Sequence, residues 1–564
     1  MKKQHNYALN EVTRFDTIKE MLEIAEREAG DKTAFKYRTG GETVEISYKQ
    51  FNDETKYLGT AITNLGIVDN HIACIGENSY KWVLSYLTVL KSSSVFVPVD
   101  KELPADDIVN VLINSDSEVL FYSSTYEDML MQNLDRLGSI KYFIGFDRDE
   151  ISEDGRFISF DALLKMGIQK LEEGDESYTS QTFDPMKLKL LVYTSGTTGL
   201  AKGVMLTEHN LVSCVYYGLQ ISTVYDTCLS VLPYHHTYES VAGLLVSIHM
   251  HSTICINDKI RNVLKNLQFF KPSYIYLVPA FAETFYKKIW ASAKDSGREK
   301  SLKQGIKISR ALRTVGIDKR KQLFKSIHDQ FGGRLRKIVC GGAPIRSEIG
   351  RFFDDIGIDL ISGYGITECS PLVSANRDYF NDFTTAGVKL PCIEVKIDGV
   401  NEDNNGEICV KGDTVMLGYY KNPEESERVL RDGWFYTGDY GTINEEGQIT
   451  ITGRKKNLIV LTNGKNIYPE EIENYILSIP YVEEVIVSAI RDDNGGEAAL
   501  SAEVYLNPDK VKEIEDTEII DQLKKDIKDQ CRSLPSYKQI QKVIIRDTAF
   551  NKTTTNKIKR NYAK

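Results

Sequence analysis

The stretch KLKLLVYTSGTTGLAKGVMLT (residues 187–207) places a loop of small and hydroxyl-bearing residues between two apolar runs. The runs at 187–194 and 203–207 are typical of buried strands, and EHNLVSCV after Thr207 is typical of a helix start. Thr207 is the type of residue that caps a helix N-terminus. The stretch therefore predicts a strand, a covering loop, a second strand and then a helix capped by Thr207.

The loop itself, YTSGTTGLAKG (193–203), holds three glycines, three threonines, one serine and one lysine. Backbone N–H groups, hydroxyl donors and an ammonium group together suit a polyphosphate. A P-loop is excluded, because Leu200 and Ala201 separate Gly199 from Lys202, whereas the P-loop lysine directly follows the last glycine. An ordinary solvated turn between strands is the alternative.

Composition restricts the class of protein. A chain of 564 residues is too long for one core, so two or more domains are expected. A net charge of −10 argues against a general nucleic-acid binder. The N-terminal residues contain no apolar signal region, and the longest apolar stretch, 241–256, is too short to span a bilayer. Nine scattered cysteines form no CxxC pair. We expect a cytoplasmic protein with reduced thiols.

The segment 294–337 departs from this acidic balance, with fourteen Lys or Arg residues against four Asp or Glu. A solvated helical face is the simpler interpretation. A peripheral contact with an anionic membrane surface is the alternative.

Four further stretches combine glycine, proline or charged residues with neighbouring apolar runs. They are RLRKIVCGGAPI (334–345), GYGITECSP (363–371), DGWFYTGDYGTI (432–443) running into GRKKNLIVLTNGKNIYPEEIE (453–473), and NKTTTNKIKR (551–560). Each alone is consistent with a turn, a cap or a solvated tail. Their order and spacing together resemble the adenylate-forming superfamily, which includes acyl-CoA synthetases, luciferases and peptide-synthetase adenylation domains.

Within that superfamily the chain is most similar to long-chain fatty-acid CoA ligases. That likeness rests on LPYHHTYE (232–239), KPSYIYLVPAFAETFYKKI (271–289) and FGGRLRKIVCGGAPI (331–345). The resemblance implies attack of a fatty-acid carboxylate on the α-phosphate of ATP, giving acyl-adenylate and pyrophosphate, and then transfer of the acyl group to CoA with release of AMP. The implied cofactors and co-substrates are ATP, Mg²⁺ and CoA.

The resemblance also implies roles for individual residues. The loop would wrap the β- and γ-phosphates through Thr194, Ser195, Gly196, Thr197, Thr198, Gly199 and Lys202. Glu368 and Thr194 would be the Mg²⁺ ligands, and Thr367 would donate a hydrogen bond to the α-phosphate. His236 would lie at the mouth of the acyl pocket. Lys557 would lie between the acyl carboxylate and the α-phosphate. Nucleotide and CoA contacts would come from Gly341, Gly342, Tyr364, Gly365, Asp439, Arg454 and Gly464.

The expected fold is α/β: a large layered domain over residues 1–453 and a smaller, mobile α+β domain over 454–564, with a hinge near Lys456. The family's last motif usually reads P-K-T-x-x-G-K, whereas this chain has Asn551 and Asn556 at the proline and glycine positions. Asparagine tolerates left-handed backbone, so the turn can persist.

Three alternatives stay open at this point. The thiol acceptor could be an acyl carrier protein, and the acid could be a medium-chain or aryl acid. A non-catalytic paralogue that binds a nucleotide or a lipid is the third, motivated by the altered last motif.

Overall fold

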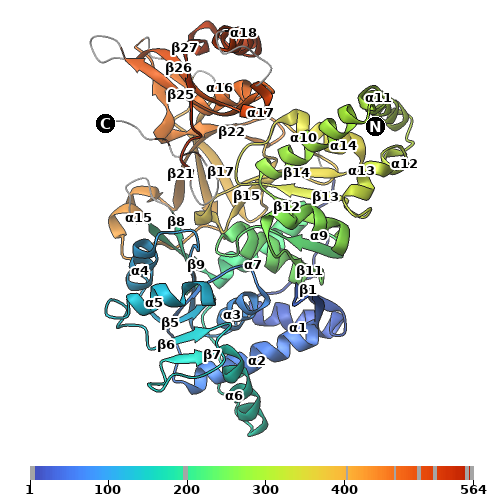
Figure 1. The fold of residues 1–564 in the computed structure, drawn as a ribbon. Helices are drawn as coiled ribbons and strands as arrows, with labels where there is room; N and C mark the ends of the chain where they lie inside the picture. The colour runs from blue at the N-terminus through green and yellow to red at the C-terminus, as the bar shows by residue number, and fades with distance from the viewer. Residues whose placement is uncertain are drawn as a thin grey trace. The chain divides into compact units, whose positions relative to one another are not determined.

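The computed structural model describes residues 7–194, 201–401, 404–462, 465–491, 497–511, 518–552, 558 and 560. The chain forms two compact units (Figure 1). The first comprises Met1–Val395, Val410–Phe435 and Asn444–Ile449, and the second comprises Lys396–Cys409, Tyr436–Ile443 and Thr450–Lys564. The predicted α/β class, with a larger N-terminal and a smaller C-terminal part, is confirmed.

One sheet of the first unit contains the two strands that flank the glycine-rich loop. Its order is β19-β9-β8-β4-β3-β5-β6-β7, with the stretch from β8 to β7 parallel and β9 antiparallel to both β8 and β19. Its strands are almost continuously apolar, as expected for a parallel sheet covered on both faces. They are β3 (His71–Ile75), β4 (Val95–Pro98), β5 (Ser117–Tyr122), β6 (Tyr142–Gly145), β7 (Phe157–Ser159), β8 (Leu188–Thr194), β9 (Lys202–Thr207) and β19 (Gly418–Tyr419).

Several of the helices α1 to α7 begin at caps that the sequence supplies. Ser47, Ser79 and Ser159 each accept a backbone N–H through their hydroxyls at the starts of α2, α3 and α6. The helices are α1 (Ile18–Ala29), α2 (Tyr48–Asn64), α3 (Tyr80–Leu90), α4 (Ala105–Asn114), α5 (Glu127–Gln132), α6 (Phe160–Glu172) and α7 (Glu208–Ile221).

A second sheet of the first unit has the order β16-β15-β14-β13-β12-β10-β11-β1-β2. Its strands are β1 (Thr33–Thr39), β2 (Glu42–Ser47), β10 (Thr227–Ser230), β11 (Thr253–Ile256), β12 (Tyr274–Leu277), β13 (Lys337–Cys340), β14 (Asp359–Gly365), β15 (Leu372–Ala375) and β16 (Val388–Lys389). The central pairs from β1 to β14 through β11, β10, β12 and β13 are parallel.

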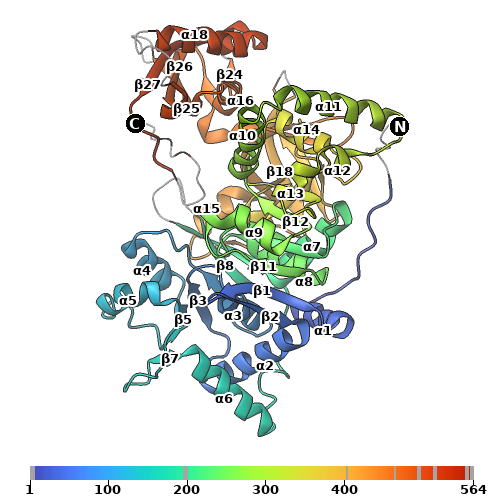
Figure 2. The same cartoon turned by 45° about the vertical axis from the view of Figure 1, so that its right-hand side comes forward.

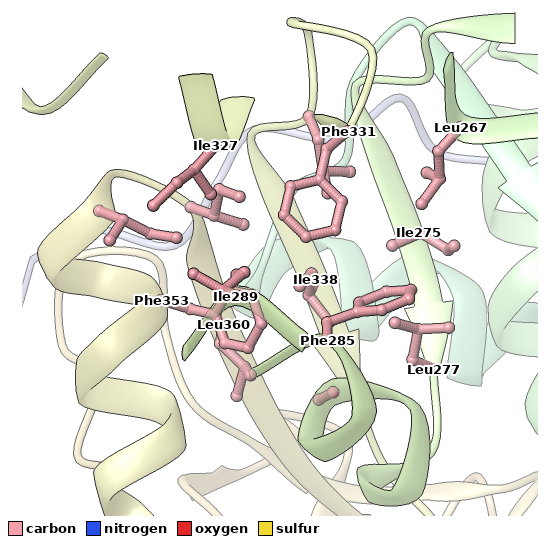
Figure 3. Packing of buried hydrophobic residues seen from close by; sticks show 14 of the residues in the cluster. Leu267, Ile275, Leu277, Phe285, Ile289, Ile327, Phe331, Ile338, Phe353 and Leu360 are labelled. Carbon is pink, nitrogen blue, oxygen red and sulfur yellow. The ribbon is translucent and has the colours of Figure 1, made fainter. Parts of the chain in front are cut away.

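A hydrophobic core lies between this sheet and the helices α9 (Val263–Phe270), α10 (Pro279–Asp295), α13 (Lys325–Gln330) and α14 (Ser347–Ile356). Figure 3 shows Phe285 and Ile289 of α10 facing Ile338 of β13 and Leu277 of β12. This packing fixes the end of β13, where the predicted Gly341 and Gly342 begin.

The pattern of residues after GRKKN predicts a strand, a helix, two strands, a helix and a strand. The second unit follows this order, with the short pair β23 (Ile459–Val460) and β24 (Asn466–Ile467) in place of the first strand and the short helix α17 (Pro508–Val511) before α18. β25 (Val482–Arg491) and β26 (Glu497–Leu506) are antiparallel, and β27 (Ile540–Arg546) is parallel to β26. Apolar side chains of α16 (Pro469–Ile476) and α18 (Ile519–Gln530) pack on this sheet. Among the described residues, no helix is long and apolar enough to cross a membrane.

A further sheet has the order β17-β18-β21-β20, with β22 beside β21. It presents the TGD segment. Its strands are β17 (Ile393–Asp398), β18 (Gly406–Gly412), β20 (Leu430–Arg431), β21 (Trp434–Ile443) and β22 (Ile449–Arg454).

Candidate active site

The ends of the glycine-rich loop are held together by strand pairing. β8 and β9 form an antiparallel pair in which Thr194 lies opposite Lys202. The two predicted strands that flank the loop are therefore confirmed. The predicted phosphate-binding residues Ser195, Gly196, Thr197, Thr198 and Gly199 lie outside the described residues.

Thr207 ends β9 and caps α7, as predicted. Its hydroxyl accepts the N–H of Asn210, and the Asn210 side chain accepts the N–H of Thr207, which completes a capping box. Asn210 also donates to the carbonyls of Asp413 and Val415, at 2.7 and 3.1 Å. The helix cap thereby positions the segment that leads into β19 beside β9.

Lys202 at the start of β9 forms an ion pair with Glu425 of α15 (Pro423–Val429). Glu425 also accepts two hydrogen bonds from Arg428 at 2.6 Å. The hydrogen bonds from Arg428 and Lys202 lower the pKa of Glu425 to about 2, so its carboxylate is ionised at neutral pH. The Lys202 ammonium also lies 5.3 Å from the centre of the Tyr419 ring.

Tyr419 links Lys202 to the predicted metal ligand Glu368. The Tyr419 hydroxyl donates to Oε1 of Glu368 at 2.8 Å, and both side chains are largely buried. Burial, and then the Glu368 charge, raise the pKa of Tyr419, so it remains a neutral donor. The structure thus brings Thr194, Lys202 and Glu368 together at the ends of β8, β9 and β19.

Thr367 and Glu368 belong to the 3₁₀ turn η4 (Thr367–Cys369), which joins β14 to β15. A Cβ on the predicted Gly365 would lie 2.4 Å from the carbonyl oxygen of Pro371, so only glycine fits there. The N–H of Ile366 donates to the same carbonyl at 2.8 Å. This tight return places Tyr364, which is buried, Thr367 and Glu368 at the C-terminal end of β14.

Gly341 and Gly342 follow β13 directly. A Cβ on Gly341 would lie 3.1 Å from the Tyr238 ring, and Gly342 has a left-handed φ of +85°. The Tyr238 hydroxyl donates to the Val339 carbonyl at 3.0 Å. Tyr238 begins the π-helix η2 (Tyr238–Leu245), so Gly341 is packed against the helix that follows the two histidines.

His236 precedes η2 and accepts the N–H groups of Glu239 and Ser240 through its carbonyl oxygen. Its ring lies 4.4 Å from that of His235. His235 is buried, with Nε2 3.2 Å from a carboxylate oxygen of Asp100. Burial, and then His236, lower the pKa of His235 to about 3, so His235 is neutral.

In the second unit the structure brings Asp439 and Arg454 together. Arg454 donates from Nε to Asp439 Oδ1 at 2.7 Å, and the Asp439 side chain is 3% exposed. Gly438 takes a left-handed φ of +70°, and its N–H donates to Glu407 at 3.1 Å. The TGD segment is therefore a kinked part of β21 whose carboxylate faces the arginine that ends β22.

The remaining predicted residues are placed only in part. Lys456 lies in the turn η5 (Lys455–Asn457), where burial, and then the Arg454 charge, lower its pKa. Gly464 and Lys557 lie outside the described residues. Within the described part of the chain, no group of three or more His, Cys, Asp or Glu side chains could hold a metal ion.

Glu425, Tyr419 and Tyr238 were not predicted as site residues. The segment YYKNPEE (419–425) signals a helix start through Asn422 and Pro423, and this signal is local. Nothing in the sequence indicates that Glu425 meets Lys202, which lies 223 positions earlier.

Comparisons with known proteins agree with this arrangement. The model of the AMP-binding enzyme family matches residues 22–420, and that of the AMP-binding enzyme C-terminal domain matches residues 456–564. Long-chain-fatty-acid–CoA ligase 5 of Rattus norvegicus is 32% identical over 467 residues, covering 76% of this chain and 67% of the relative.

Two further relatives extend the comparison. The chloroplastic long-chain-fatty-acid–[acyl-carrier-protein] ligase AEE15 of Arabidopsis thaliana is 27% identical over 81% of this chain and 72% of its own length. The crystal structure of the anthranilate CoA ligase AuaEII with anthranoyl-AMP has the same fold, with a TM-score of 0.75 over 99% of this chain and 97% of that one, at 18% identity. The chain therefore belongs to the AMP-binding enzyme family.

Proposed function

We propose that this protein is an AMP-forming long-chain fatty-acid CoA ligase. Its carboxylate substrate would attack the α-phosphate of ATP, forming acyl-adenylate and releasing pyrophosphate. The CoA thiolate would then attack the acyl carbon, forming the thioester and releasing AMP. The observation that carries this proposal is the family match, together with relatives named long-chain-fatty-acid–CoA ligase over three quarters of the chain.

The first unit supplies groups suited to the pyrophosphate part of ATP. Lys202 lies at one end of the loop and Thr194 at the other, so the residues between them can supply N–H and hydroxyl donors to the β- and γ-phosphates. Thr367 would donate to the α-phosphate. Tyr364 and Gly365 would contact adenine, and Gly341 and Gly342 would allow the backbone to approach the base and the acyl chain.

The oxygen donors near the loop fit Mg²⁺. Glu368 offers a largely buried carboxylate, already held by the Tyr419 hydroxyl, and Thr194 offers a hydroxyl. Oxygen ligands are those that this hard cation prefers. When bound, Mg²⁺ would neutralise phosphate charge so that a carboxylate anion can approach.

The second unit supplies groups for the ribose and for the two chemical steps. Asp439 would accept hydrogen bonds from the ribose hydroxyls, with Arg454 orienting its carboxylate. Lys557 would bridge the acyl carboxylate and the α-phosphate, and Gly464 would lie at the pantetheine path. His236, in the first unit, would gate entry of the acid. We propose domains of 1–453 and 454–564 with Lys456 as the hinge.

An acyl-carrier-protein ligase is the second candidate, favoured by the similarity to the Arabidopsis enzyme. The two functions share the first half-reaction and differ in the thiol that consumes the adenylate. A medium-chain or aryl acid substrate differs only in the acid. A non-catalytic paralogue would carry out neither half-reaction.

The test is acid-dependent exchange of pyrophosphate with ATP, measured over fatty acids of increasing length and over aryl acids. CoA and an acyl carrier protein are then offered as acceptors. We expect exchange with long-chain acids and thioester formation with CoA. Exchange followed by transfer only to the carrier protein would favour the second candidate, and no exchange with any acid would refute both ligase proposals.

We also propose that the protein is cytoplasmic and touches membranes peripherally through residues 294–337. Long-chain acids partition into membranes, so a ligase that docks on the bilayer meets a higher local concentration of substrate. The positive balance of this segment supports contact with anionic lipid.

A further inference from the structure

Four large apolar side chains lie exposed on one short part of the first unit. Ile308 is 50% exposed, Val315 69%, Ile317 45% and Leu323 42%. They belong to α11 (Glu299–Thr314), α12 (Arg320–Leu323) and the turn between these helices. Figures 1 and 2 both show α11 and α12 at the outer edge of the first unit.

The opposite side of α11 accounts for its place in the fold. Leu302 is buried, Phe324 packs against Gly305, and Ser309 donates to the backbone carbonyl of Asp355 in α14 at 3.0 Å. The inner face of α11 is thus already occupied. The exposed apolar residues are therefore not needed for this contact with the core.

Two groups of basic residues in α11, α12 and the turn between them differ in their partners. Arg310, Arg313 and Arg320 form ion pairs with Asp354 or Asp355 of α14, so these arginines fasten α11 and α12 to the unit. Lys300, Lys307, Lys319 and Lys321 are exposed and form no ion pair within the described part of the chain. We call these four lysines and the four apolar residues the α11–α12 face.

Basic and apolar groups on one surface match an anionic lipid bilayer. Lysine side chains are attracted to lipid phosphates, while neighbouring apolar side chains enter the boundary between headgroups and acyl chains. A solvated helix surface accounts for the lysines alone, whereas four large exposed apolar side chains within the same short segment favour a lipid surface. An acidic protein partner would form ion pairs with the lysines but would not explain why the apolar side chains are exposed beside them.

We infer that the α11–α12 face is a docking surface for an anionic lipid bilayer. The inference rests on the proposed peripheral contact of 294–337 and narrows it from fourteen basic residues to four lysines and four apolar side chains. It also excludes Arg310, Arg313 and Arg320 from lipid binding, because their partners lie within the fold.

The experiment is co-sedimentation of the full chain with vesicles of phosphatidylcholine alone and of phosphatidylcholine mixed with phosphatidylglycerol, at low and physiological salt. The charge variant is Lys307→Glu, Lys319→Glu and Lys321→Glu combined. The apolar variant is Ile308→Ser, Val315→Ser and Ile317→Ser combined. The matched control reverses three exposed lysines elsewhere in the first unit, Lys165, Lys187 and Lys265.

We expect the parent to bind the anionic vesicles preferentially, and the charge variant to lose at least about tenfold in affinity at low salt. The apolar variant should lose affinity at both salt concentrations, because its contribution is not screened. The control should retain at least half of the parent's affinity. Each variant should keep the parent's melting temperature within a few degrees and its ligase rate on detergent-dispersed acid.

The outcomes separate the inference from the proposals on which it rests. If the parent protein does not co-sediment with anionic vesicles at low salt, the proposed peripheral membrane contact of residues 294–337 is wrong. If the parent binds anionic vesicles and the charge and apolar variants bind them equally well, the protein contacts membranes but the α11–α12 face is not the docking surface. Ligase activity with dispersed acid tests the proposed reaction independently of either result.

Discussion

The Glu368 carboxylate is largely buried and accepts a hydrogen bond from the Tyr419 hydroxyl. Substitution by glutamine therefore tests the role of its negative charge at nearly constant shape. We predict that Glu368→Gln nearly abolishes Mg²⁺-dependent pyrophosphate exchange, because the amide keeps the size of the side chain but removes the anionic ligand. Loss of such an electrostatic group typically costs roughly 2.7 to 4 kcal/mol in the transition state, or about a hundredfold to a thousandfold in rate. The measurement is exchange rate against Mg²⁺ concentration.

Tyr419→Phe is the matched variant for this prediction. It removes the hydroxyl that donates to Glu368 but leaves the carboxylate and the ring in place. We expect a smaller loss and a weaker apparent affinity for Mg²⁺. A Glu368→Gln protein within threefold of the parent rate would contradict the assignment of Glu368 as a metal ligand.

Glu239 in η2 gives a prediction about pH. It is 1% exposed, and burial raises its pKa to about 8 in the folded protein, well above the usual value. Between about pH 5 and pH 8 the folded state therefore holds a proton that the unfolded chain has released. Stability falls as pH rises through this window, with a limiting slope of about 1.4 kcal/mol per pH unit.

The variant Glu239→Gln removes this titration while keeping an acceptor for the Ser230 hydroxyl. We predict that its melting temperature, relative to the parent's, increases steadily from pH 5 to pH 8. Thermal unfolding across this range is the measurement, with exposed Glu153→Gln as the control. Parallel curves for the parent and Glu239→Gln would show that the Glu239 carboxyl does not titrate in this window.

At the scale of elements, the Lys202–Glu425 pair joins β9 to α15. We predict that Lys202→Gln raises KM for ATP at least about tenfold with little change in KM for the acid, because a cation aimed at phosphate is lost. Glu425→Gln should raise KM for ATP by a smaller factor, since Lys202 keeps its charge but loses one restraint. Steady-state kinetics with each substrate varied separately are the measurement.

Glu427→Gln on the exposed side of the same helix is the control and should match the parent. The stability cost of breaking the pair should be at most about 1 kcal/mol, because the pair is partly exposed to solvent. An unchanged KM for ATP in Lys202→Gln would argue that the loop closes on phosphate without this lysine.

The elements differ in how far the sequence determines them. β8, β9 and the Thr207 cap were predictable because apolar runs, glycine content and capping chemistry are local signals. The α16 to β27 order was predictable for the same reason. The pairing of Tyr419 with Glu368 was not, because it depends on β19 joining the far edge of a sheet whose other strands precede residue 208.

The same limit applies to charge patterns. Fourteen basic residues in 294–337 predict a positive surface, but sequence alone does not separate Lys307, which faces solvent, from Arg310, which binds Asp355 at 2.8 Å. The contacts of Tyr238 at the start of the π-helix η2 are likewise not indicated by the sequence, because Gly341 and the Leu277 carbonyl of β12 lie far from Tyr238 along the chain.

At the scale of the whole molecule, the proposed reaction places different demands on the two units. Adenylation needs a cation between two anions, and we assign that cation to Lys557, far along the second unit. Thioester formation instead needs open access for the CoA thiolate to the acyl carbon of the adenylate. One arrangement of the proposed domains 1–453 and 454–564 that serves both steps equally is therefore unfavourable, and a change about the proposed hinge Lys456 is the simplest alternative.

We accordingly predict that the half-reactions separate by mutation. Lys557→Ala should lower pyrophosphate exchange by at least about a hundredfold, yet still convert supplied acyl-adenylate and CoA to thioester. Lys456→Pro should spare exchange and slow thioester formation, because fixing φ at the hinge obstructs the change that follows adenylation. Lys559→Ala and Lys456→Ala are the controls, since the first keeps the nearby Lys557 charge and the second keeps backbone freedom. Equal damage to both half-reactions in Lys557→Ala and in Lys456→Pro would refute two arrangements for this chain, even with the ligase reaction itself established.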